Sequence, residues 1–421
     1  MPLILTKHDQ EMLDGAYGPA VQMAMSILVQ MADVYQADEL LDISAAHIDS
    51  TIYIGVSGME YAERLADFGA QVAVPTTLNV SGLDEHHWQE WSVPNEWASN
   101  ARRQMLAYQR MGAVPTWTCA PYQTVYRPEF GQQIAWGESN AIVFANSVIG
   151  ARTERYPDLL DICCAITGRA PAAGLHLTQN RAGEVQLSMV DIPGKLQSAD
   201  VFYPVFGHLV GKLAGDLIPV ITGLDTIPTD DQHKAFGAAA ATSGQVALYH
   251  MVGVTPEAPN LEAALHGKPA LDYIEITMQD LLSAKRELST ISESKLDMVA
   301  LGCPHFSVDE FGMLAQFIDG KIKNPAVQMH ITSNRDTIKQ AKSLGYFEKL
   351  EAFGAKFTVD TCILATPMLG PEIKTLMTNS GKYAYYTPGL LGKNILYSSL
   401  EDCAASAIAG RIMMDESIWE K

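Results

Sequence analysis

The sequence predicts an α/β protein built from several βαβ domains whose sheets are mainly parallel. From about Tyr273 onward, short apolar runs of strand length alternate regularly with helical segments, which is the pattern of βαβ units. A chain of 421 residues that is 48% hydrophobic and 18% charged has the composition of an ordinary packed protein of two or three domains. Because βαβ connections are almost always right-handed, the ends of the strands should gather at one edge of each sheet.

The first half of the chain holds the less regular elements. Thr6, followed by Asp9 three residues later, predicts the start of a helix. Further helices are expected over residues 59–68, 95–111 and 157–167. Apolar runs predict strands at residues 40–48, 70–74 and 114–118, and the run at residues 140–147 also has the length of a strand.

The second half of the chain is more regular. Residues 230–243 and 308–317 predict helices, and Ser307 with Glu310 has the pattern of a capping box at the start of the latter. Strands are expected at residues 218–222, 246–252, 297–301, 327–331, 356–359 and 373–377. We therefore expect three α/β domains, at about residues 1–135, 136–270 and 271–421.

The charge of the chain argues against two classes of partner. The 29 basic and 48 acidic side chains give a net charge of −19, whereas nucleic acids and anionic membranes are bound by basic surfaces. The sequence shows no signal-peptide pattern and no uninterrupted apolar run of 18 or more residues. We expect a cytoplasmic protein that binds neither nucleic acid nor membrane. Its six cysteines do not have the spacing of a disulfide framework.

Three cysteines directly follow strand-like runs. Cys119, Cys303 and Cys362 all occupy such positions, and open α/β sheets bind their ligands at the carboxyl ends of strands. Three thiolates that meet there could hold an iron–sulfur cluster and leave one iron open for a substrate. They could equally be buried as small apolar side chains, and no CxxC spacing decides between the two hypotheses. The other three cysteines lie in predicted helices and are interpreted as core residues: Cys163, Cys164 and Cys403.

Polar residues gather near the same strand ends. His305 follows Cys303 closely and could hydrogen-bond a substrate, while Ser307 could contact substrate or simply cap a helix. Loops rich in hydroxyls, amides and free N–H groups bind carboxylates or phosphates, although they also serve as plain turns. Arg152 could form a bidentate pair with a carboxylate, or could pair with neighbouring acidic residues. The further candidates are Thr76, Thr77, Asn79, Glu138, Asn140, Asn146, Ser147, Ser380 and Lys382.

The combination of these stretches indicates a family. The chain resembles aconitase X, the divergent branch of the aconitase superfamily, and is similar to its large, catalytic subunit. The resemblance extends from about residue 5 to residue 411. It rests on Pro75-Thr-Thr-Leu-Asn79, Thr118-Cys-Ala-Pro-Tyr122, Glu138-Ser-Asn-Ala141, Asn146-Ser-Val-Ile-Gly-Ala-Arg-Thr153, Gly302-Cys-Pro-His-Phe-Ser307, Asp360-Thr-Cys362 and Thr378-Asn-Ser-Gly-Lys382. Gly381 departs slightly from the family pattern, which usually has alanine there.

The resemblance implies an aconitase-like fold around a central iron–sulfur cluster, either [4Fe-4S] or [2Fe-2S], held by Cys119, Cys303 and Cys362. It implies a hydro-lyase that removes water from a small hydroxy acid. Members of the family act on cis-3-hydroxy-L-proline, giving Δ1-pyrroline-2-carboxylate, or on mevalonate 5-phosphate, and we expect the former substrate here. Arg152, Asn79 and the loop around Ser380 would orient the carboxylate of the substrate. The residues expected to be catalytic are His305, Ser380 and Lys382.

The resemblance also implies a second protein unit. In this superfamily a swivelling domain closes over the cluster and brings a catalytic serine, and in aconitase X that domain carries a Ser-rich loop. The family encodes the domain either fused or as a separate small subunit. Because the sequence contains no such Ser run, we expect a separate small subunit as a partner.

Functions of other classes stay open at this point. A non-catalytic binding protein of the same fold would simply bury its three cysteines, and a cluster-free lyase would use a single divalent ion. The sequence contains no G-x-S-x-G elbow of a serine hydrolase, no G-x-G-x-x-G dinucleotide fingerprint and no GxxxxGK[ST] phosphate loop.

Overall fold

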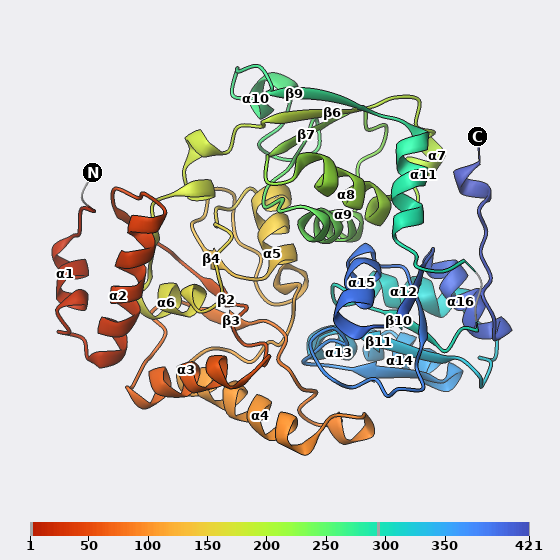
Figure 1. The fold of residues 1–421 in the computed structure, drawn as a ribbon, viewed down its shortest axis with the longest axis horizontal. Helices are drawn as coiled ribbons and strands as arrows, with labels where there is room; N and C mark the ends of the chain where they lie inside the picture. The colour runs from red at the N-terminus through yellow and green to blue at the C-terminus, as the bar shows by residue number, and fades with distance from the viewer. Residues whose placement is uncertain (1–2, 293–294, 421) are drawn as a thin grey trace.

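The computed structural model describes residues 3–292 and 295–420, which form three α/β units around a common centre (Figure 1). We call them the first unit (residues 3–180), the second unit (183–288) and the third unit (295–420). The strand pairs within each main sheet are parallel, which confirms the predicted fold class. The domain boundaries expected from the sequence stay a prediction.

The first unit combines a small parallel sheet with helices on its outside. Its main sheet has the order β3-β2-β4, and β1 and β5 form a separate antiparallel pair. The elements are α1 (Lys7–Leu13), α2 (Pro19–Val34), β1 (Leu40–Asp42), β2 (Ala46–Ile48), α3 (Val56–Asp67), β3 (Thr76–Leu78), α4 (Asn95–Arg110), β4 (Ala135–Trp136), α5 (Ser139–Phe144), α6 (Leu160–Thr167) and β5 (Arg169–Pro171).

The second unit is a four-stranded parallel sheet of order β8-β7-β6-β9 with helices packed against it. Helices α8 and α9 lie in close contact at Gly207. A Cβ atom there would clash with the carbonyl oxygen of Phe236, so the contact requires glycine. The elements are β6 (Val185–Met189), α7 (Gly194–Gln197), α8 (Phe202–Ala214), β7 (Pro219–Thr222), α9 (Asp230–Ser243), β8 (His250–Met251), α10 (Leu261–Ala264), β9 (Asp272–Ile276) and α11 (Met278–Glu287).

The third unit has five parallel strands in the order β12-β11-β10-β13-β14. The chain runs outward from β10 in one direction and then returns to add β13 on its other side, so β10 and β13 flank a topological switch point, where such sheets bind ligands. The elements are β10 (Met298–Leu301), α12 (Val308–Phe317), β11 (Gln328–Thr332), α13 (Arg335–Ser343), α14 (Tyr346–Phe353), β12 (Ala355–Thr358), β13 (Thr375–Thr378), α15 (Gly381–Tyr386), β14 (Asn394–Tyr397) and α16 (Leu400–Ala409).

Four strand predictions were wrong or misplaced. Residues 40–48 form two strands of different sheets, β1 and β2, rather than one. Residues 140–147 form α5 and continue into a π-helix (Ala145–Ile149) rather than a strand. This helix is buried on every side, so its sequence lacks the polar face that distinguishes a helix from a buried strand. Residues 114–118 make only an isolated bridge from Val114 to Thr77, and the strand expected at residues 70–74 lies slightly later, in β3.

The three cysteines interpreted as core residues are buried, as expected. Cys163 and Cys164 lie in α6 and Cys403 in α16, and all three are 0% exposed. Within the described residues, every helix is too short or too polar to cross a bilayer.

Candidate active site

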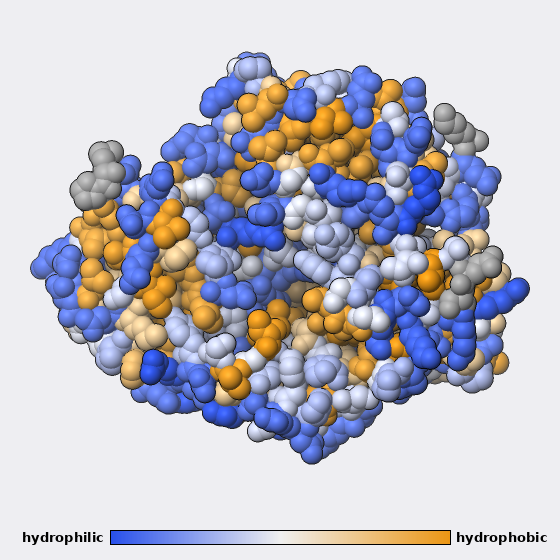
Figure 2. All heavy atoms as spheres, viewed as in Figure 1, coloured by the Kyte–Doolittle hydropathy of each residue, from blue (hydrophilic) through white to orange (hydrophobic). Residues whose placement is uncertain are grey.

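Strand ends of the first and third units meet at the centre of the molecule. Cys303 follows β10, Cys362 follows β12 and Lys382 lies at the start of α15, directly after β13. Burial raises the pKa of Cys303 well above its ordinary value, and the other charges that act on it are Lys382, Cys362, Cys119 and Glu138. The three thiols therefore lie within electrostatic reach of one another. Figure 2 shows the molecular face hollowed near its centre, where the three units meet.

Each cysteine-bearing loop begins with left-handed backbone. Trp117, Gly302 and Asp360 have φ angles of 45°, 89° and 67°, and each lies one or two residues before its cysteine. A side chain in this conformation costs roughly 1–2 kcal/mol, and residues held in such conformations cluster at functional sites. At Gly302 no other residue fits, because a Cβ atom there would clash with the carbonyl oxygen of Thr332.

The Cys119 loop is held by α5 and by the third unit. Asn140 at the start of α5 donates to the carbonyl oxygen of Cys119 at 3.1 Å and to the Tyr122 hydroxyl at 2.9 Å. The backbone N–H of His305 donates to the Sγ of Cys119 at 3.3 Å. Asn140 thus supports a cysteine loop from within the core, where it is 0% exposed.

His305 connects the three cysteine loops. Its ring is 0% exposed, and Nε2 donates to the carbonyl oxygen of Thr361 at 3.3 Å, so Nδ1 is the atom that accepts from Thr118 at 3.3 Å. Burial lowers the pKa of His305 to about 4. A neutral imidazole with both nitrogens engaged supports the loops around it, which favours a positioning role over the catalytic role expected from the sequence.

The Cys362 loop is anchored on the first unit. Thr361 donates its hydroxyl to the carbonyl oxygen of Ser81 at 2.8 Å. Asp360 accepts two bonds from Arg335, at 2.8 and 2.6 Å, and Arg335 also pairs with Glu85 at 2.7 Å. These bonds join the first and third units next to the thiols, which explains why the loop keeps its conformation without being part of a strand.

Lys382 and Glu138 form a buried ion pair beside the thiols. The ammonium Nζ lies 2.7 Å from the carboxylate of Glu138. Burial opposes the charged form of Lys382, but Glu138 and the neighbouring thiols of Cys303 and Cys119 outweigh it, so the pKa of Lys382 lies above its ordinary value. Glu138 also caps α5, accepting the N–H of Ala141 at 2.7 Å. The site therefore contains a fixed cation that can face an anionic substrate.

Asp49 belongs to the site, and the sequence analysis missed it. It directly follows β2, accepts a hydrogen bond from the side chain of Asn79, and lies within electrostatic reach of Glu138 and Lys382. Burial and the nearby carboxylates of Glu138, Asp158 and Asp161 raise the pKa of Asp49 well above its ordinary value. Asp49 directly follows the predicted strand at residues 40–48, so the rule that selected the cysteines, a reactive side chain at a strand end, also applies to it.

Asn79 is the other polar group that points to a ligand. Its side chain is 1% exposed and its Oδ1 has no hydrogen-bond partner in the described part of the chain. An unpaired buried acceptor costs about 1–3 kcal/mol. A donor group of a bound substrate would satisfy it.

Several predicted site residues have structural partners instead. Arg152 donates to the carbonyl oxygen of His176 at 3.2 Å and to Thr178 at 2.7 Å, in a separate polar cluster of the first unit. Asn146 and Ser147 bond backbone groups near β8, Thr76 bonds Val74, Thr77 bonds His47, and Ser307 caps α12. Ser380 caps α15 and donates to the carbonyl oxygen of Cys303, so it lies at the site.

The cysteine set fits a metal cluster in chemistry and accessibility. Cys119, Cys303 and Cys362 are free thiols that are partly exposed, unlike the three core cysteines. Burial raises the pKa of each, so the thiols are protonated by themselves, whereas a coordinating metal deprotonates a thiol outright. Among residues 3–292 and 295–420, no three His, Cys, Asp or Glu side chains are arranged to bind a single ion. Thiolates on separate irons of one cluster need not surround a single ion.

Comparison with known proteins decides the family. Models of the first, second and third domains of aconitase X match residues 2–179, 184–286 and 296–409. The chain belongs to the aconitase X family. It is an enzyme of the hydro-lyase class, since the curated relatives of this family are dehydratases.

The relatives include two kinds of dehydratase. A cis-3-hydroxy-L-proline dehydratase from Pseudomonas aeruginosa is 45% identical over 99% of this chain and 72% of its own length. The large subunit of phosphomevalonate dehydratase from Methanothermobacter thermautotrophicus is 38% identical, over 93% of this chain and 96% of its own length. The crystal structure of aconitase X from Thermococcus kodakaraensis in its holo-form matches with a TM-score of 0.87 at 33% identity, covering 96% of this chain and 100% of that one.

Gly381, the departure from the aconitase X pattern, lies in a tight contact with the second unit. A Cβ atom there would lie 3.1 Å from Cβ of Ala239 and 3.1 Å from the carbonyl oxygen of Pro204. These neighbours would have to move by a few tenths of an ångström to accept an alanine. Glycine thus brings the start of α15, and with it Lys382, against α8 and α9.

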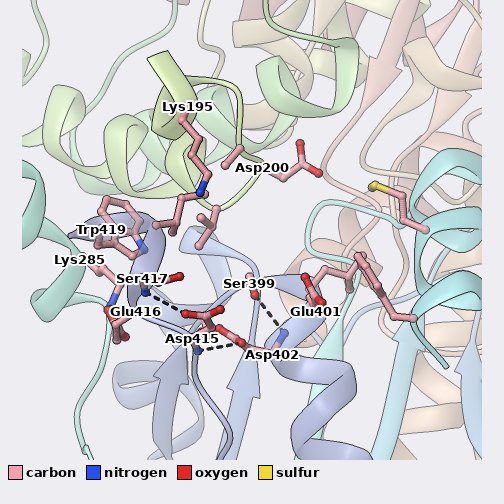
Figure 3. Close-up of a pocket in the computed structure, with 17 residues that line it drawn as sticks. Lys195, Asp200, Lys285, Ser399, Glu401, Asp402, Asp415, Glu416, Ser417 and Trp419 are labelled. Atoms are coloured by element: carbon pink, nitrogen blue, oxygen red, sulfur yellow. Dashed lines mark hydrogen bonds and ion pairs between the residues drawn. The ribbon is translucent and has the colours of Figure 1, made fainter. Parts of the chain in front are cut away.

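A cavity whose lining includes none of the three thiols lies near the C-terminus. It has a volume of about 320 Å³ between α7 and α16 and is lined by the C-terminal segment, including Trp419 (Figure 3). Its charged groups bond one another: Lys285 pairs with Glu416 at 2.7 Å, and Asp402 accepts the N–H of Asp415 at 3.1 Å. These bonds fasten the C-terminal segment to the body of the protein, and we assign the cavity no chemistry.

Replacement of Gly302 tests the geometry of the Cys303 loop in this family member. Gly302→Ala should lower the free energy of unfolding by about 3 kcal/mol, because left-handed strain adds to the clash with Thr332. Gly320→Ala is the matched control, since Gly320 has a φ of 66° but no atom within 4 Å of its Cβ position, and should cost only about 1 kcal/mol. Urea unfolding of both variants measures the difference, and equal losses would contradict the close approach at Gly302.

Proposed function

We propose that this chain is the large subunit of an iron–sulfur dehydratase that removes water from cis-3-hydroxy-L-proline to give Δ1-pyrroline-2-carboxylate. The observation that carries the choice of substrate is the charge of the site. Lys382 pairs with the carboxylate of Glu138 and lies within electrostatic reach of Asp49, whose other charged neighbours are the carboxylates of Asp158 and Asp161. A phosphate-bearing substrate calls for several cations, whereas a zwitterionic amino acid brings an ammonium of its own.

The positions of three basic side chains, Arg335, Arg152 and Lys382, support this choice. Arg335 is occupied by Asp360 and Glu85, and Arg152 bonds groups near Thr178. Of these three basic side chains, Lys382 is the one whose charge acts on the thiols. The relatives point the same way: the two named cis-3-hydroxy-L-proline dehydratases are 45% and 42% identical to this chain, and the named phosphomevalonate dehydratases 29–38%.

The residues of this chain would divide the work as follows. Lys382 binds the substrate carboxylate, and Asp49 accepts the ring ammonium, which relieves the repulsion among its neighbouring carboxylates. The unpaired Oδ1 of Asn79 accepts a further donor group. In the reaction the Cα–H and C3–O bonds break, the ring gains a C=C bond that tautomerises to the imine, and the proton and hydroxide leave as water.

A cluster bound by Cys119, Cys303 and Cys362 would supply a Lewis acid for the departing hydroxyl. These thiols are the ligands we assign to it, and the type of cluster stays open between [4Fe-4S] and [2Fe-2S]. His305, Asn140 and Ser380 hold the cysteine loops through the bonds described above.

We further propose that turnover needs a separate small subunit that provides the swivelling domain and its serine. The curated phosphomevalonate dehydratase large subunits match this chain over nearly their whole length, while it spans about 70% of the cis-3-hydroxy-L-proline dehydratases. Closure by a second unit would exclude water and complete the catalytic set. A cytoplasmic location stays a prediction.

Substitution of the cysteines tests the cluster. We expect Cys→Ala at position 119, 303 or 362 to abolish bound iron and the associated visible absorption in anaerobically purified protein. Cys164→Ala and Cys403→Ala are matched controls that should keep the wild-type iron content, because these buried thiols lie in helices away from the site. Iron retention by any of the first three variants would remove that thiol from the ligand set.

Direct competition between substrates tests the reaction. With the small subunit added, kcat/KM for cis-3-hydroxy-L-proline should exceed that for mevalonate 5-phosphate by at least about 100-fold, since a mismatched polar site discriminates strongly. A higher value for the phosphorylated compound would refute the assignment. Full turnover by the purified 421-residue chain alone would instead refute the need for a small subunit.

A further inference from the structure

A buried lysine of the second unit reaches the turn that carries Cys303. Lys234 lies on α9 and is 2% exposed. Its Nζ forms ion pairs with Asp231 at 2.8 Å and Glu310 at 2.5 Å, and donates to the carbonyl oxygen of His305 at 3.3 Å. The sequence analysis assigned this residue only to a helix.

The two carboxylates around Lys234 are themselves fixed by the start of α12. Asp231 accepts the hydroxyl of Ser307 at 2.5 Å, and Glu310 accepts the N–H of Ser307 at 2.8 Å. Burial raises the pKa of Glu310 to about 7, against the influence of Lys234, and the two carboxylates outweigh burial to raise the pKa of Lys234. The network is therefore a closed set of charge-assisted bonds between the second and third units.

The carbonyl that Lys234 holds belongs to the residue that touches all three cysteine loops. The N–H of His305 donates to Cys119, its ring donates to Thr361 next to Cys362, and its chain continues from Cys303 through Pro304. The segment between β10 and α12 has no regular structure of its own. Its position therefore depends on side-chain bonds: Asp231 of the second unit holds Ser307, and Lys234 supplies the bond from the second unit to His305.

Stability alone does not explain an ammonium at this place. Buried ion pairs and triads can often be replaced by apolar residues of similar volume without loss of stability. Groups that orient metal ligands behave differently, because their loss typically costs 10–100-fold in metal affinity or activity. The two roles can therefore be separated by experiment.

We propose that Lys234 is a positioning residue of the active centre, which fixes the turn after Cys303 and through His305 sets the relative positions of the three thiols. The inference rests on the proposed function in one respect, that these thiols hold an iron–sulfur cluster. It adds that the second unit, which contributes none of the three thiols, controls how firmly they hold it.

The test uses variants that separate positioning from folding. Lys234→Met leaves two buried carboxylates without their counter-ion and could unfold the chain, so the main variant is the double substitution Lys234→Met with Glu310→Gln. It preserves the net charge of the network, and glutamine can still accept the N–H of Ser307. Lys234→Arg tests rescue of the lost bond. Lys212→Met is the matched control, since Lys212 pairs with Glu287 on the exposed side of the same unit.

The measurements are the half-life of bound iron against a chelator, and kcat and KM with the small subunit. The double variant should fold with an unchanged circular dichroism spectrum but lose iron at least about 10-fold faster, with kcat lowered by at least about 10-fold and KM nearly unchanged. Lys234→Arg should recover part of both losses, and Lys212→Met should match the wild type.

The possible failures are distinguishable. If the wild-type chain takes up no iron, the proposed function fails and this inference fails with it. If the wild-type chain is loaded and the double variant retains iron and kcat at the wild-type level, this inference alone is overturned. A loss confined to the unfolding midpoint would also overturn it, because Lys234 would then be only structural.

Discussion

The ion pair between Lys382 and Glu138 joins the third unit to the first at the place where three thiols meet. Glu138 is held by the start of α5, and Lys382 is pressed against the second unit through Gly381. Neither side chain has much access to water, so removal of either one would leave a buried charge without its counter-ion. The pair thus places a fixed cation beside the cysteines only when all three units are assembled correctly.

The loops around this pair contain strained backbone conformations just before the three cysteines. Each cysteine follows a residue with left-handed backbone, and two of these, Trp117 and Asp360, are not glycine. Strained conformations of this kind persist only where several surrounding interactions hold them in place. Here Arg335 and Glu85 hold Asp360, and Asn140 with His305 holds the Cys119 loop. The site is rigid because bonds from different units fix each loop, rather than because the loops are extended strands.

The sequence predicted the parts of this arrangement that depend on local patterns. The helices at residues 230–243 and 308–317 have the predicted bounds, since capping residues mark their starts, and the strand-end rule selected three thiols that lie within electrostatic reach of one another. It failed where tertiary contacts decide. The helix at α5 resembles a strand because it is buried all round, and Arg152 was assigned to the substrate although its partners lie near Thr178.

The residues that the sequence could not show are those whose role depends on long-range neighbours. Asp49 follows a predicted strand, but its link to the site emerges only from its bond with Asn79, and Lys234 becomes a candidate only when α9 is seen to lie against the turn at His305. Both are ordinary residues of their own segments. Their chemistry arises from burial and from partners in other elements, which no local pattern encodes.

The central claim is that Lys382 and Glu138 act as one unit at the active centre, and a double-mutant cycle on kcat tests it most directly. The variants are Glu138→Gln, Lys382→Met and the two combined, each measured with the small subunit and cis-3-hydroxy-L-proline. Residues that act as a unit are strongly non-additive. The account predicts that each single change lowers kcat by at least about 100-fold and that the double variant is no worse than the poorer single one. Losses that multiply in the double variant would show that the two residues act independently, and would contradict it.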